Sequence, residues 1–216
     1  MIVFKLIIMN KGKIQFITDG VDSQSVLSQV ETVVSNGINW VQFRMKNECF
    51  DNKVVIGEKI KHICAKHGAT FIINDDVQLA KVLQADGVHL GLGDMSPVEA
   101  RELLGENAII GATCNTIEDI RLRHQQGVDY VGLGPFRYTT TKKNLSPILG
   151  LEGYNSIISK MLDEGIDIPV VSIGGIRVDD IKSLMGTGIH GIAISSLITT
   201  ADCKQDVINK IISAIN

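Results

Sequence analysis

Residues 126–134 read Q-G-V-D-Y-V-G-L-G, a glycine followed almost at once by a short apolar run. Glycine commonly ends a helix, and an unbroken run rich in valine and isoleucine is typical of a buried parallel strand. The same pattern recurs as N-G-I-N-W-V-Q (36–42), Q-A-D-G-V-H (84–89) and T-G-I-H-G-I-A (187–193). Each recurrence marks a helix end and a strand start, which predicts a chain of alternating helices and strands.

Extending this pattern along the chain predicts eight strands, each followed by a helix. The predicted strands are residues 14–18, 40–44, 70–74, 87–91, 108–112, 130–134, 169–173 and 191–195. The predicted helices, which have apolar residues at helical spacing, are residues 23–36, 51–67, 77–83, 96–104, 116–126, 151–164, 178–185 and 205–215. Eight such units predict a (β/α)₈ TIM barrel. We expect a single domain over residues 1–216, with the eight units in about 10–200. The alternative is an open doubly wound sheet, which usually has fewer strands.

The composition argues against a nucleic-acid-binding protein. The chain has 216 residues, a net charge of −3 and a sequence pI of about 5.9, so an anion site must be local. The apolar start is interrupted by Lys5 and is too short to cross a membrane, and either Met1 or Met9 could be the first residue. The cysteines lack metal-binding spacing and fit a reducing compartment. We therefore expect a cytoplasmic protein without nucleic-acid or membrane partners.

Polar residues that follow the strands are the candidates for a site, because TIM-barrel chemistry lies at the carboxyl ends of the strands. After the second predicted strand, alternation places Gln42, Arg44 and Lys46 on one side of the chain. Cations that face a barrel mouth are costly without a partner. A structural Arg–carboxylate pair would explain one of these residues, whereas an anion site explains all three.

Two carboxylates follow the next two predicted strands. Asp75 and Asp94 can approach one another, because adjacent parallel strands lie ~4.8 Å apart. Facing carboxylates repel unless a cation or a shared proton lies between them, and Mg²⁺ with its oxygen ligands would meet that need. The alternative is helix capping, by Asp75 or Asp76 at Val77 and by Asp94 at Ser96. Both interpretations remain open at this point.

The last three strands are followed by residues suited to phosphate. The stretch V-G-L-G-P-F-R-Y-T-T-T-K-K-N (131–144) follows the sixth strand and contains Thr139, Thr141 and Lys142. Gly174-Gly175 follows the seventh strand and Ser195-Ser196 the eighth, where TIM barrels often bind phosphate. The strand ends together predict a transfer between two phosphorylated small molecules.

Three further residues near the strand ends have ordinary structural explanations. We expect Asn115 to cap the helix after the fifth strand, Cys114 to be an inert thiol and His89 to be a packed core histidine.

At these residues the chain resembles the thiamine-phosphate synthase family, from about Ile14 to Ile198. The motifs that carry the resemblance occur in order along the chain. They are I-T-D (17–19), V-Q-F-R-M-K (41–46), I-N-D (73–75), A-D-G-V-H-L-G (85–91), G-P-F-R-Y-T-T-T-K (134–142) and I-G-G-I (173–176). The resemblance implies that hydroxymethylpyrimidine diphosphate and thiazole phosphate are joined, through a pyrimidine carbocation, to give thiamine phosphate and pyrophosphate. It also implies Mg²⁺ and a homodimer.

The resemblance assigns a role to each candidate. Gln42 and Asn74 would contact the pyrimidine, and Thr113, where the family commonly has Ser, would lie near the reacting centre. The diphosphate would be bound by Arg44, Lys46, Asn74 and Lys142, and the Mg²⁺ ion by Asp75 and Asp94. The thiazole phosphate would be bound by Thr139, Thr141, Gly175, Ser195 and Ser196. The groups acting in catalysis would be Arg44, Lys46, Thr113 and Lys142.

The sequence departs from the family pattern at a few positions. Leu92-Gly93 replaces the usual polar pair before Asp94, and Asp76 stands where Arg is common. A thiazole tautomerase-like isomerase is an alternative on the same barrel, but that relative typically has a His at the position of Asn115. A non-catalytic thiazole-phosphate-binding protein is a second alternative. Whether the thiazole substrate carries a carboxylate stays open.

Overall fold

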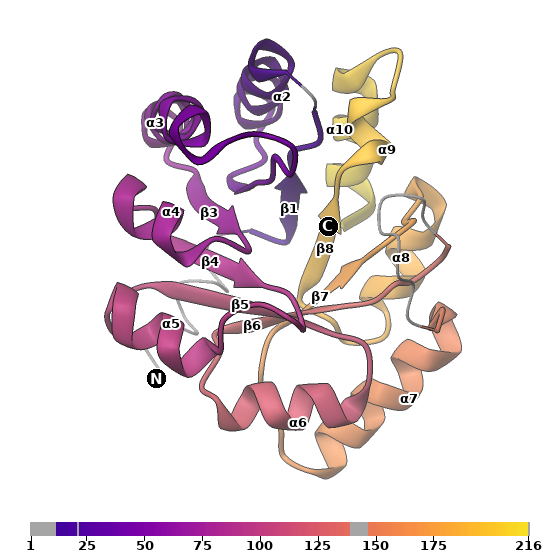
Figure 1. The fold of residues 1–216 in the computed structure, drawn as a ribbon. Coiled ribbons are helices and arrows are strands. Elements are labelled where there is room, and N and C mark those ends of the chain that lie inside the picture. Colours follow the sequence, from indigo (N-terminus) through magenta and orange to yellow (C-terminus); the bar gives the residue numbers. More distant parts are fainter. Residues whose placement is uncertain (1–11, 21, 139–146, 216) are drawn as a thin grey trace.

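The structure is a computed structural model that describes residues 12–20, 22–138 and 147–215. Within these residues, eight parallel strands pair in sequence order and close into a barrel, as the sequence predicts (Figure 1). The strands are β1 (Ile14–Ile17), β2 (Trp40–Phe43), β3 (Thr70–Asn74), β4 (Gly87–Leu90), β5 (Ile109–Cys114), β6 (Tyr130–Leu133), β7 (Val170–Ile173) and β8 (Gly191–Ile194).

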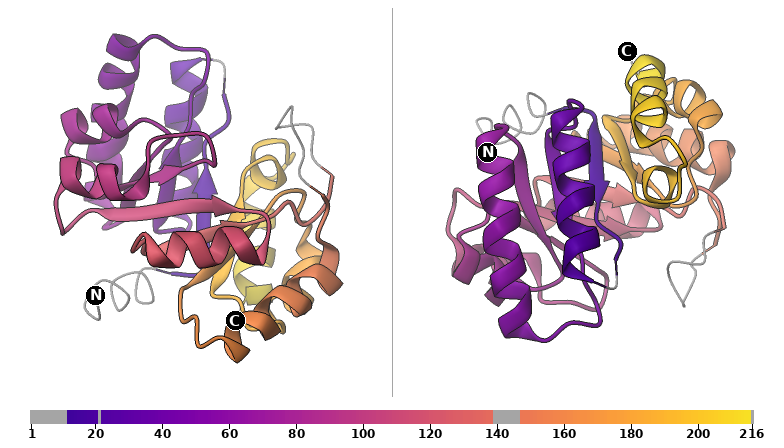
Figure 2. Two further views of the ribbon diagram at one scale, coloured as in Figure 1. Left: turned by 60° about the horizontal axis from the view of Figure 1, so that its bottom comes forward. Right: turned by 90° about the horizontal axis from the view of Figure 1, so that it is seen from above.

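The helices surround the ring of strands (Figures 1 and 2). They are α2 (Ser23–Ser35), α3 (Phe50–Lys66), α4 (Val77–Leu83), α5 (Pro97–Leu104), α6 (Ile117–Gln125), α7 (Gly150–Asp163), α8 (Ile181–Met185), α9 (Ser196–Thr199) and α10 (Lys204–Ile215). A 3₁₀ turn, η1 (Val178–Asp180), precedes α8. The C-terminal helix α10 packs against α2, so the last unit meets the first around the ring.

Both faces of the strands are buried, which explains their unbroken apolar sequences. The large apolar cluster lies between strands and helices and includes Phe43 and Val131. A smaller cluster fills the barrel and includes Trp40 and Tyr130, whose ring centroids lie 4.9 Å apart. Gly111 makes room for Tyr130, because a Cβ at this glycine would lie 2.1 Å from Tyr130 Cζ.

The element boundaries differ from the predicted ones in two informative places. Strand β5 runs to Cys114, two residues beyond its predicted end, because Thr113 and Cys114 pair with β6. Helix α9, which starts at Ser196, was not predicted, because four residues are too few to show a helical period.

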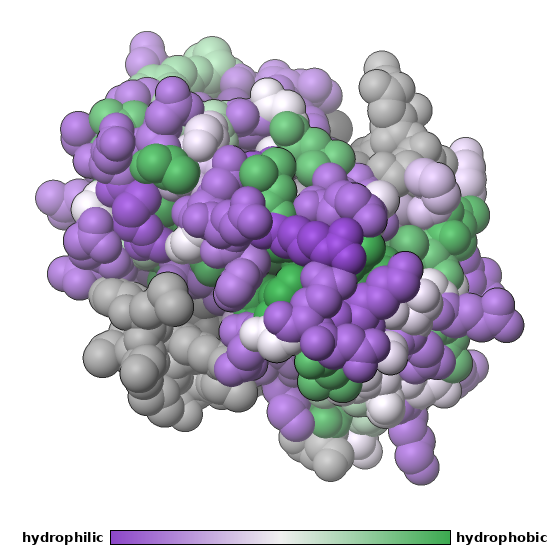
Figure 3. Space-filling model, turned by 90° about the horizontal axis from the view of Figure 1, so that it is seen from below, coloured by the Kyte–Doolittle hydropathy of each residue, from purple (hydrophilic) through white to green (hydrophobic). Residues whose placement is uncertain are grey.

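The outer surface carries both polar and apolar side chains. The face seen in Figure 3 is mainly hydrophilic, with hydrophobic residues between the hydrophilic ones. Among the described residues, no helix has both the length and the apolar character that crossing a membrane requires.

Candidate active site

A cavity of about 370 Å³ opens at the carboxyl ends of the strands. Residues on or just after all eight strands line it. It brings together most of the residues predicted from the sequence, namely Gln42, Arg44, Lys46, Asn74, Asp75, Asp94, Thr113, Gly175, Ser195 and Ser196. The predicted residues Thr139, Thr141 and Lys142 lie outside the described residues.

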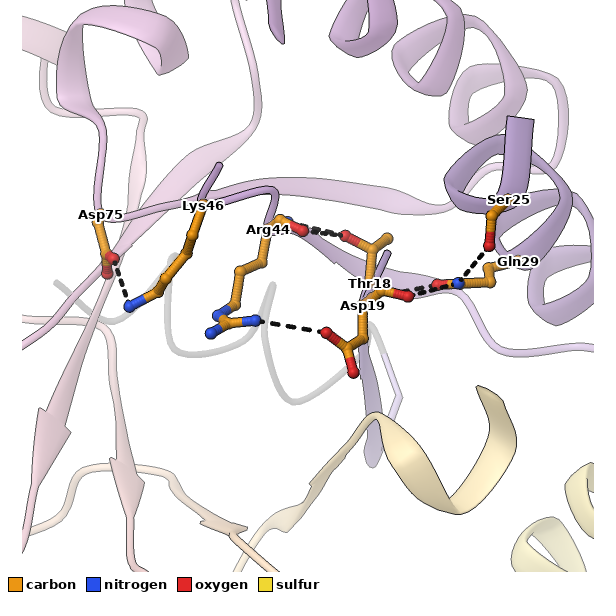
Figure 4. Close-up of polar contacts among 7 residues, drawn as sticks. All are labelled: Thr18, Asp19, Ser25, Gln29, Arg44, Lys46 and Asp75. Carbon is orange, nitrogen blue, oxygen red and sulfur yellow. Dashed lines mark hydrogen bonds and ion pairs between the residues drawn. The ribbon is translucent and has the colours of Figure 1, made fainter. Parts of the chain in front are cut away.

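Two cations extend from the end of β2 into this cavity. Arg44 and Lys46 point the same way and lie between two carboxylates (Figure 4). Arg44 Nη1 is 3.6 Å from Asp19 Oδ1, and Lys46 Nζ is 3.9 Å from Asp75 Oδ2. Phe43 and Met45 alternate with them and belong to the apolar cluster under the helices. The predicted alternation is therefore confirmed, and Asp19 is a partner that the sequence reasoning did not single out.

The backbone around Arg44 is fixed by its neighbour strand. Thr18 Oγ1 accepts a hydrogen bond from Arg44 N at 2.8 Å and donates one to Arg44 O at 3.0 Å (Figure 4). Gln29 on α2 fixes the backbone of Asp19, the residue after Thr18. Its Nε2 donates to Asp19 O, and its Oε1 accepts from Asp19 N. The backbone positions of Arg44 and Asp19 are therefore fixed by Thr18 and by Gln29 of α2 respectively.

The competing helix-cap explanation fails for Asp75 and Asp94. Asp76 is the residue that caps α4, accepting from Leu79 N at 2.9 Å. Ser96 caps α5, whereas Asp94 accepts instead from Gly91 N at 2.6 Å. Asp75 and Asp94 are left as a facing pair of carboxyl groups within hydrogen-bonding reach of one another.

This pair carries an electrostatic cost. Burial and, to a smaller extent, the neighbouring Asp94 together raise the pKa of Asp75 to about 6, against the opposing effect of Lys46. Asp75 also has a φ of 65°, a left-handed conformation that is uncommon outside glycine. Strained backbone and a perturbed carboxyl pKa in a cavity are both typical of functional sites.

The carboxylate pair fits a hard divalent cation. Mg²⁺ typically binds one or two carboxylates, keeps several waters and takes further oxygens from substrate phosphates. Among the described residues no group of three or more His, Cys, Asp or Glu side chains is placed to hold a metal. Two facing carboxylates beside two cations suit a metal that is shared with a phosphate ligand.

A chain of buried hydrogen bonds crosses the barrel beneath the cavity. Gln42 Nε2 donates to Gln15 Oε1, and Gln15 Nε2 donates to the Tyr130 hydroxyl, both at 3.0 Å. The hydroxyl pairs with His89 Nδ1 at 3.0 Å, and His89 Nε2 pairs with Thr113 Oγ1 at 3.1 Å. The chain therefore links Gln42 to Thr113 across the cavity floor.

The expected packed core position of His89 is confirmed, and its hydrogen bonds to Tyr130 and Thr113 are contacts that the sequence did not indicate. His89 is buried, but it lines the cavity and positions Thr113. When the Tyr130 hydroxyl donates to His89 Nδ1, His89 Nε2 carries the ring proton and donates to Thr113 Oγ1. The available sequence signal was the position of His89 on the barrel-facing side of β4, but its partners lie 24 and 41 residues away.

The opposite side of the cavity is neutral. Gly174 and Gly175 both have positive φ, at 97° and 68°, which glycine adopts without strain. Both line the cavity, as do Ser195 and Ser196. Ser195 Oγ is buried and has no hydrogen-bond partner in the described part of the chain. An unpartnered hydroxyl beside glycine amides suits an anionic ligand that accepts hydrogen bonds.

Asn115 and Cys114, at the end of β5, have different structural roles. Thr116 caps α6, so the expected cap Asn115 is wrong, and Asn115 Nδ2 instead donates to Gly134 O at the cavity wall. Cys114 is fully buried, and burial raises the pKa of its thiol to about 12. The inert thiol is confirmed, and Cys114 provides no nucleophile for the cavity.

Comparisons with known proteins agree on one family. Residues 14–198 match the family model described as thiamine monophosphate synthase. A thiamine-phosphate synthase of Bacteroides fragilis is 50% identical over 188 residues, covering 87% of this chain and 92% of that protein. One from Flavobacterium johnsoniae is 47% identical over 200 residues, covering 93% and 94%. A solved thiamine phosphate pyrophosphorylase from Pyrococcus furiosus superimposes with a TM-score of 0.83 at 30% identity, covering 96% of this chain and 97% of that one.

Proposed function

The chain belongs to the thiamine monophosphate synthase family, and from this premise we propose that it joins hydroxymethylpyrimidine diphosphate to thiazole phosphate. The products are thiamine phosphate and pyrophosphate, so the chain is a transferase. The observation that carries the proposal is the division of the cavity into two halves. Cations and carboxylates follow β2 to β4, and neutral glycines and serines follow β7 and β8.

The charged half binds the diphosphate in this proposal. Arg44 and Lys46 approach its oxygens and Asn74 contributes from the end of β3, and the family resemblance assigns the same role to Lys142, which lies outside the described residues. Both described cations already face carboxylates at 3.6 and 3.9 Å, distances loose enough for a phosphate to replace these partners. Their positive charge stabilises the departing pyrophosphate more than the bound substrate, which is what accelerates a reaction.

Asp75 and Asp94 would hold a Mg²⁺ ion, which when bound would offset charge on the departing pyrophosphate. The two side chains are suited to this role, because Asp76 and Ser96 supply the adjacent helix caps. The hydrogen bond from Gly91 N to Asp94 Oδ2 orients the second carboxylate toward the first.

The floor and the neutral half hold the two rings for reaction. Gln42 and Thr113, joined through the buried chain, contact the pyrimidine in this proposal. Gly175, Ser195 and Ser196, with Thr139 and Thr141, bind the thiazole phosphate.

The transfer then needs no protein nucleophile. The bond from the pyrimidine methylene carbon to the diphosphate oxygen breaks, and pyrophosphate leaves with the electron pair. The aminopyrimidine ring supports the cation that remains on the methylene carbon. The lone pair of the thiazole nitrogen forms the new carbon–nitrogen bond, and holding both rings in place lowers the barrier to this step.

The two alternatives are not favoured. The curated relatives described above are named as synthases, and Asn115 stands where the isomerase would have a histidine. A purely binding protein would not need facing carboxylates that raise the pKa of Asp75.

An Asp75→Ala variant separates catalysis from binding. It is expected to lose turnover while still binding thiazole phosphate, measured by calorimetry, because Asp75 lies on the charged side of the cavity. Glu106→Ala, a change at a surface residue outside the cavity lining, is the control. Full activity of Asp75→Ala would contradict the metal assignment. The expected homodimer is checked on the same samples by light scattering.

A further inference from the structure

Arg137, in the segment after β6, binds three groups in the segment between β7 and α8. Its Nη1 donates to Asp180 Oδ2 at 2.6 Å and its Nη2 to Asp180 Oδ1 at 2.9 Å. Nη1 also donates to Gly175 O at 2.8 Å, and the backbone N of Arg137 donates to Gly174 O at 2.9 Å. The guanidinium lies 5.1 Å from the centroid of the Phe136 ring. Arg137 therefore anchors two successive carbonyl groups of residues 174–177, the glycine loop.

Anchoring these carbonyls also fixes the amide groups that follow them. In a trans peptide the N–H points opposite to the C=O of the same plane. Because Gly174 O and Gly175 O both point to Arg137, the N–H groups of Gly175 and Ile176 point away from it. Gly174, Gly175 and Ile176 line the cavity, whereas Arg137 is absent from the described lining. Both residues that carry these N–H groups therefore belong to the cavity wall, whereas Arg137 lies behind them, outside the described lining.

The glycine loop needs such an anchor. Glycine peptides rotate readily, and Gly174 and Gly175 both have positive φ. Neither glycine tolerates a side chain, since a Cβ at Gly174 would lie 2.9 Å from Pro135 Cβ and one at Gly175 would lie 2.9 Å from Arg137 Cβ. The loop therefore cannot be stiffened by larger residues, and its orientation depends on outside contacts.

Asp180 makes the anchor rigid. It forms two parallel hydrogen bonds with the Arg137 guanidinium, a geometry that fixes orientation as well as distance. It also accepts from Arg177 N at 2.8 Å, which ties it to the far end of the same loop. The side chain of Asp180 is 16% exposed and that of Arg137 37%, so water screens the charges in part, and the orientation depends on the paired hydrogen bonds.

We propose that Arg137 is a positioning residue for the thiazole substrate. Through Gly174 O and Gly175 O it turns two backbone N–H groups toward the phosphate of that substrate. Arg137 is not among the described residues that line the cavity, and three of its five guanidinium N–H donors are used by Asp180 and Gly175, so its role in this proposal is indirect. This inference rests on the proposed function and adds a residue that acts on only one of the two substrates.

The test compares the Michaelis constants of both substrates in full-length variants. Arg137→Ala is expected to raise KM for thiazole phosphate about tenfold or more, which corresponds to losing about 1.4 kcal/mol of binding. KM for the pyrimidine diphosphate should stay within about twofold, because its side of the barrel is untouched. Arg137→Lys should give an intermediate value, since lysine keeps the charge but cannot make the two parallel hydrogen bonds.

Arg121→Ala is the matched control. Arg121 makes a comparable pair with Glu164, at 2.7 Å from Nε to Oε2, which joins α6 to the residue after α7 away from the cavity lining. Its loss should change neither constant.

A second readout does not depend on turnover. In the wild type, adding thiazole phosphate should shift the backbone amide resonances of Gly175 and Ile176 in ¹⁵N-labelled protein. In Arg137→Lys these shifts should need a higher ligand concentration.

Two results would overturn the inference. One is an Arg137→Ala enzyme with unchanged KM for thiazole phosphate; the other is an equal rise in both constants, which would indicate general damage. If Arg137→Ala does not fold, the KM values of the two substrates are compared in Arg137→Lys and Asp180→Asn instead. A wild-type protein that forms no thiamine phosphate would instead refute the proposed function, so the two failures are distinguishable.

Discussion

Replacing Asp75 by Asn should stabilise the metal-free protein while abolishing its catalysis. Asp75 faces Asp94 and is partly withdrawn from water, which raises its pKa from 3.8 to about 6. A shift of ~2 pKa units corresponds to ~3 kcal/mol before screening. Because the side chain is 38% exposed, solvent screening reduces the expected effect to ~1 kcal/mol. Asn is neutral, nearly isosteric and tolerant of the left-handed conformation at this position.

The sign of this effect depends on pH in a defined way. The folded-state pKa of Asp75 lies above its unfolded value, so the ionised carboxylate is disfavoured by folding. Ionisation therefore destabilises the wild type increasingly as the pH rises from about 4 to about 6, and fully above that range. The advantage of Asp75→Asn should be largest above pH 6 and should disappear near pH 4.

The assay is thermal unfolding in EDTA at pH 8 and at pH 4.5. At pH 8 we expect Asp75→Asn to melt about 2–4 °C above the wild type, the shift that ~1 kcal/mol gives in a domain of this size. Asp76→Ala is the contrasting control, since it removes the cap of α4 and should lower the stability by about 1 kcal/mol. An Asp75→Asn protein that is no more stable at pH 8, or whose gain persists unchanged at pH 4.5, would refute the reasoning.

Three further predictions concern the barrel interior and the thiols. Tyr130→Phe should lower the free energy of unfolding by about 1–3 kcal/mol in urea, because it leaves the buried partners of the hydroxyl unpaired. An unchanged midpoint of urea unfolding would contradict the hydrogen bonds assigned to Tyr130. Gly111→Ala should cost more than Tyr130→Phe in the same assay, because its Cβ would overlap the Tyr130 ring. Native protein should show two fast-reacting thiols with a disulfide reagent and four in denaturant; four fast thiols in native protein would be inconsistent with the burial. The exposed cysteines are Cys49 and Cys203, and the buried ones, whose thiol pKa burial raises to about 12, are Cys64 and Cys114.

The fold could be predicted because its signal is local and repeated. Each glycine-to-strand junction, such as residues 126–134, marks the start of one strand–helix unit. Eight such units in one domain are typical of a TIM barrel. The boundaries were less predictable, because pairing with a neighbour strand decides where a strand ends. Thr113 belongs to β5 only through its pairing with Gly132.

The candidate site could be predicted where residue type and strand position both mark it. Gln42, Arg44 and Lys46 follow from alternation alone, and the structure places all three in the cavity. The family resemblance is confirmed by the comparisons. The structure also excludes helix capping by Asp75 and Asp94, because the caps of α4 and α5 are Asp76 and Ser96, and metal binding by the two aspartates stays a proposal.

Contacts between distant residues were beyond sequence reasoning. An arginine in a polar loop looks ordinary, and nothing in the sequence connects Arg137 to Asp180, which is 43 residues away. The partners of His89 are distant in the same way, so only closure of the barrel reveals that it supports Thr113.

The most direct test of the account is product formation by the purified full-length protein. The protein is mixed with hydroxymethylpyrimidine diphosphate, thiazole phosphate and Mg²⁺, and thiamine phosphate is measured with and without EDTA. The account predicts product that is lost with EDTA and restored by excess Mg²⁺. A folded protein that forms no thiamine phosphate would contradict the proposed function, and product that persists in EDTA would contradict the metal role of Asp75 and Asp94.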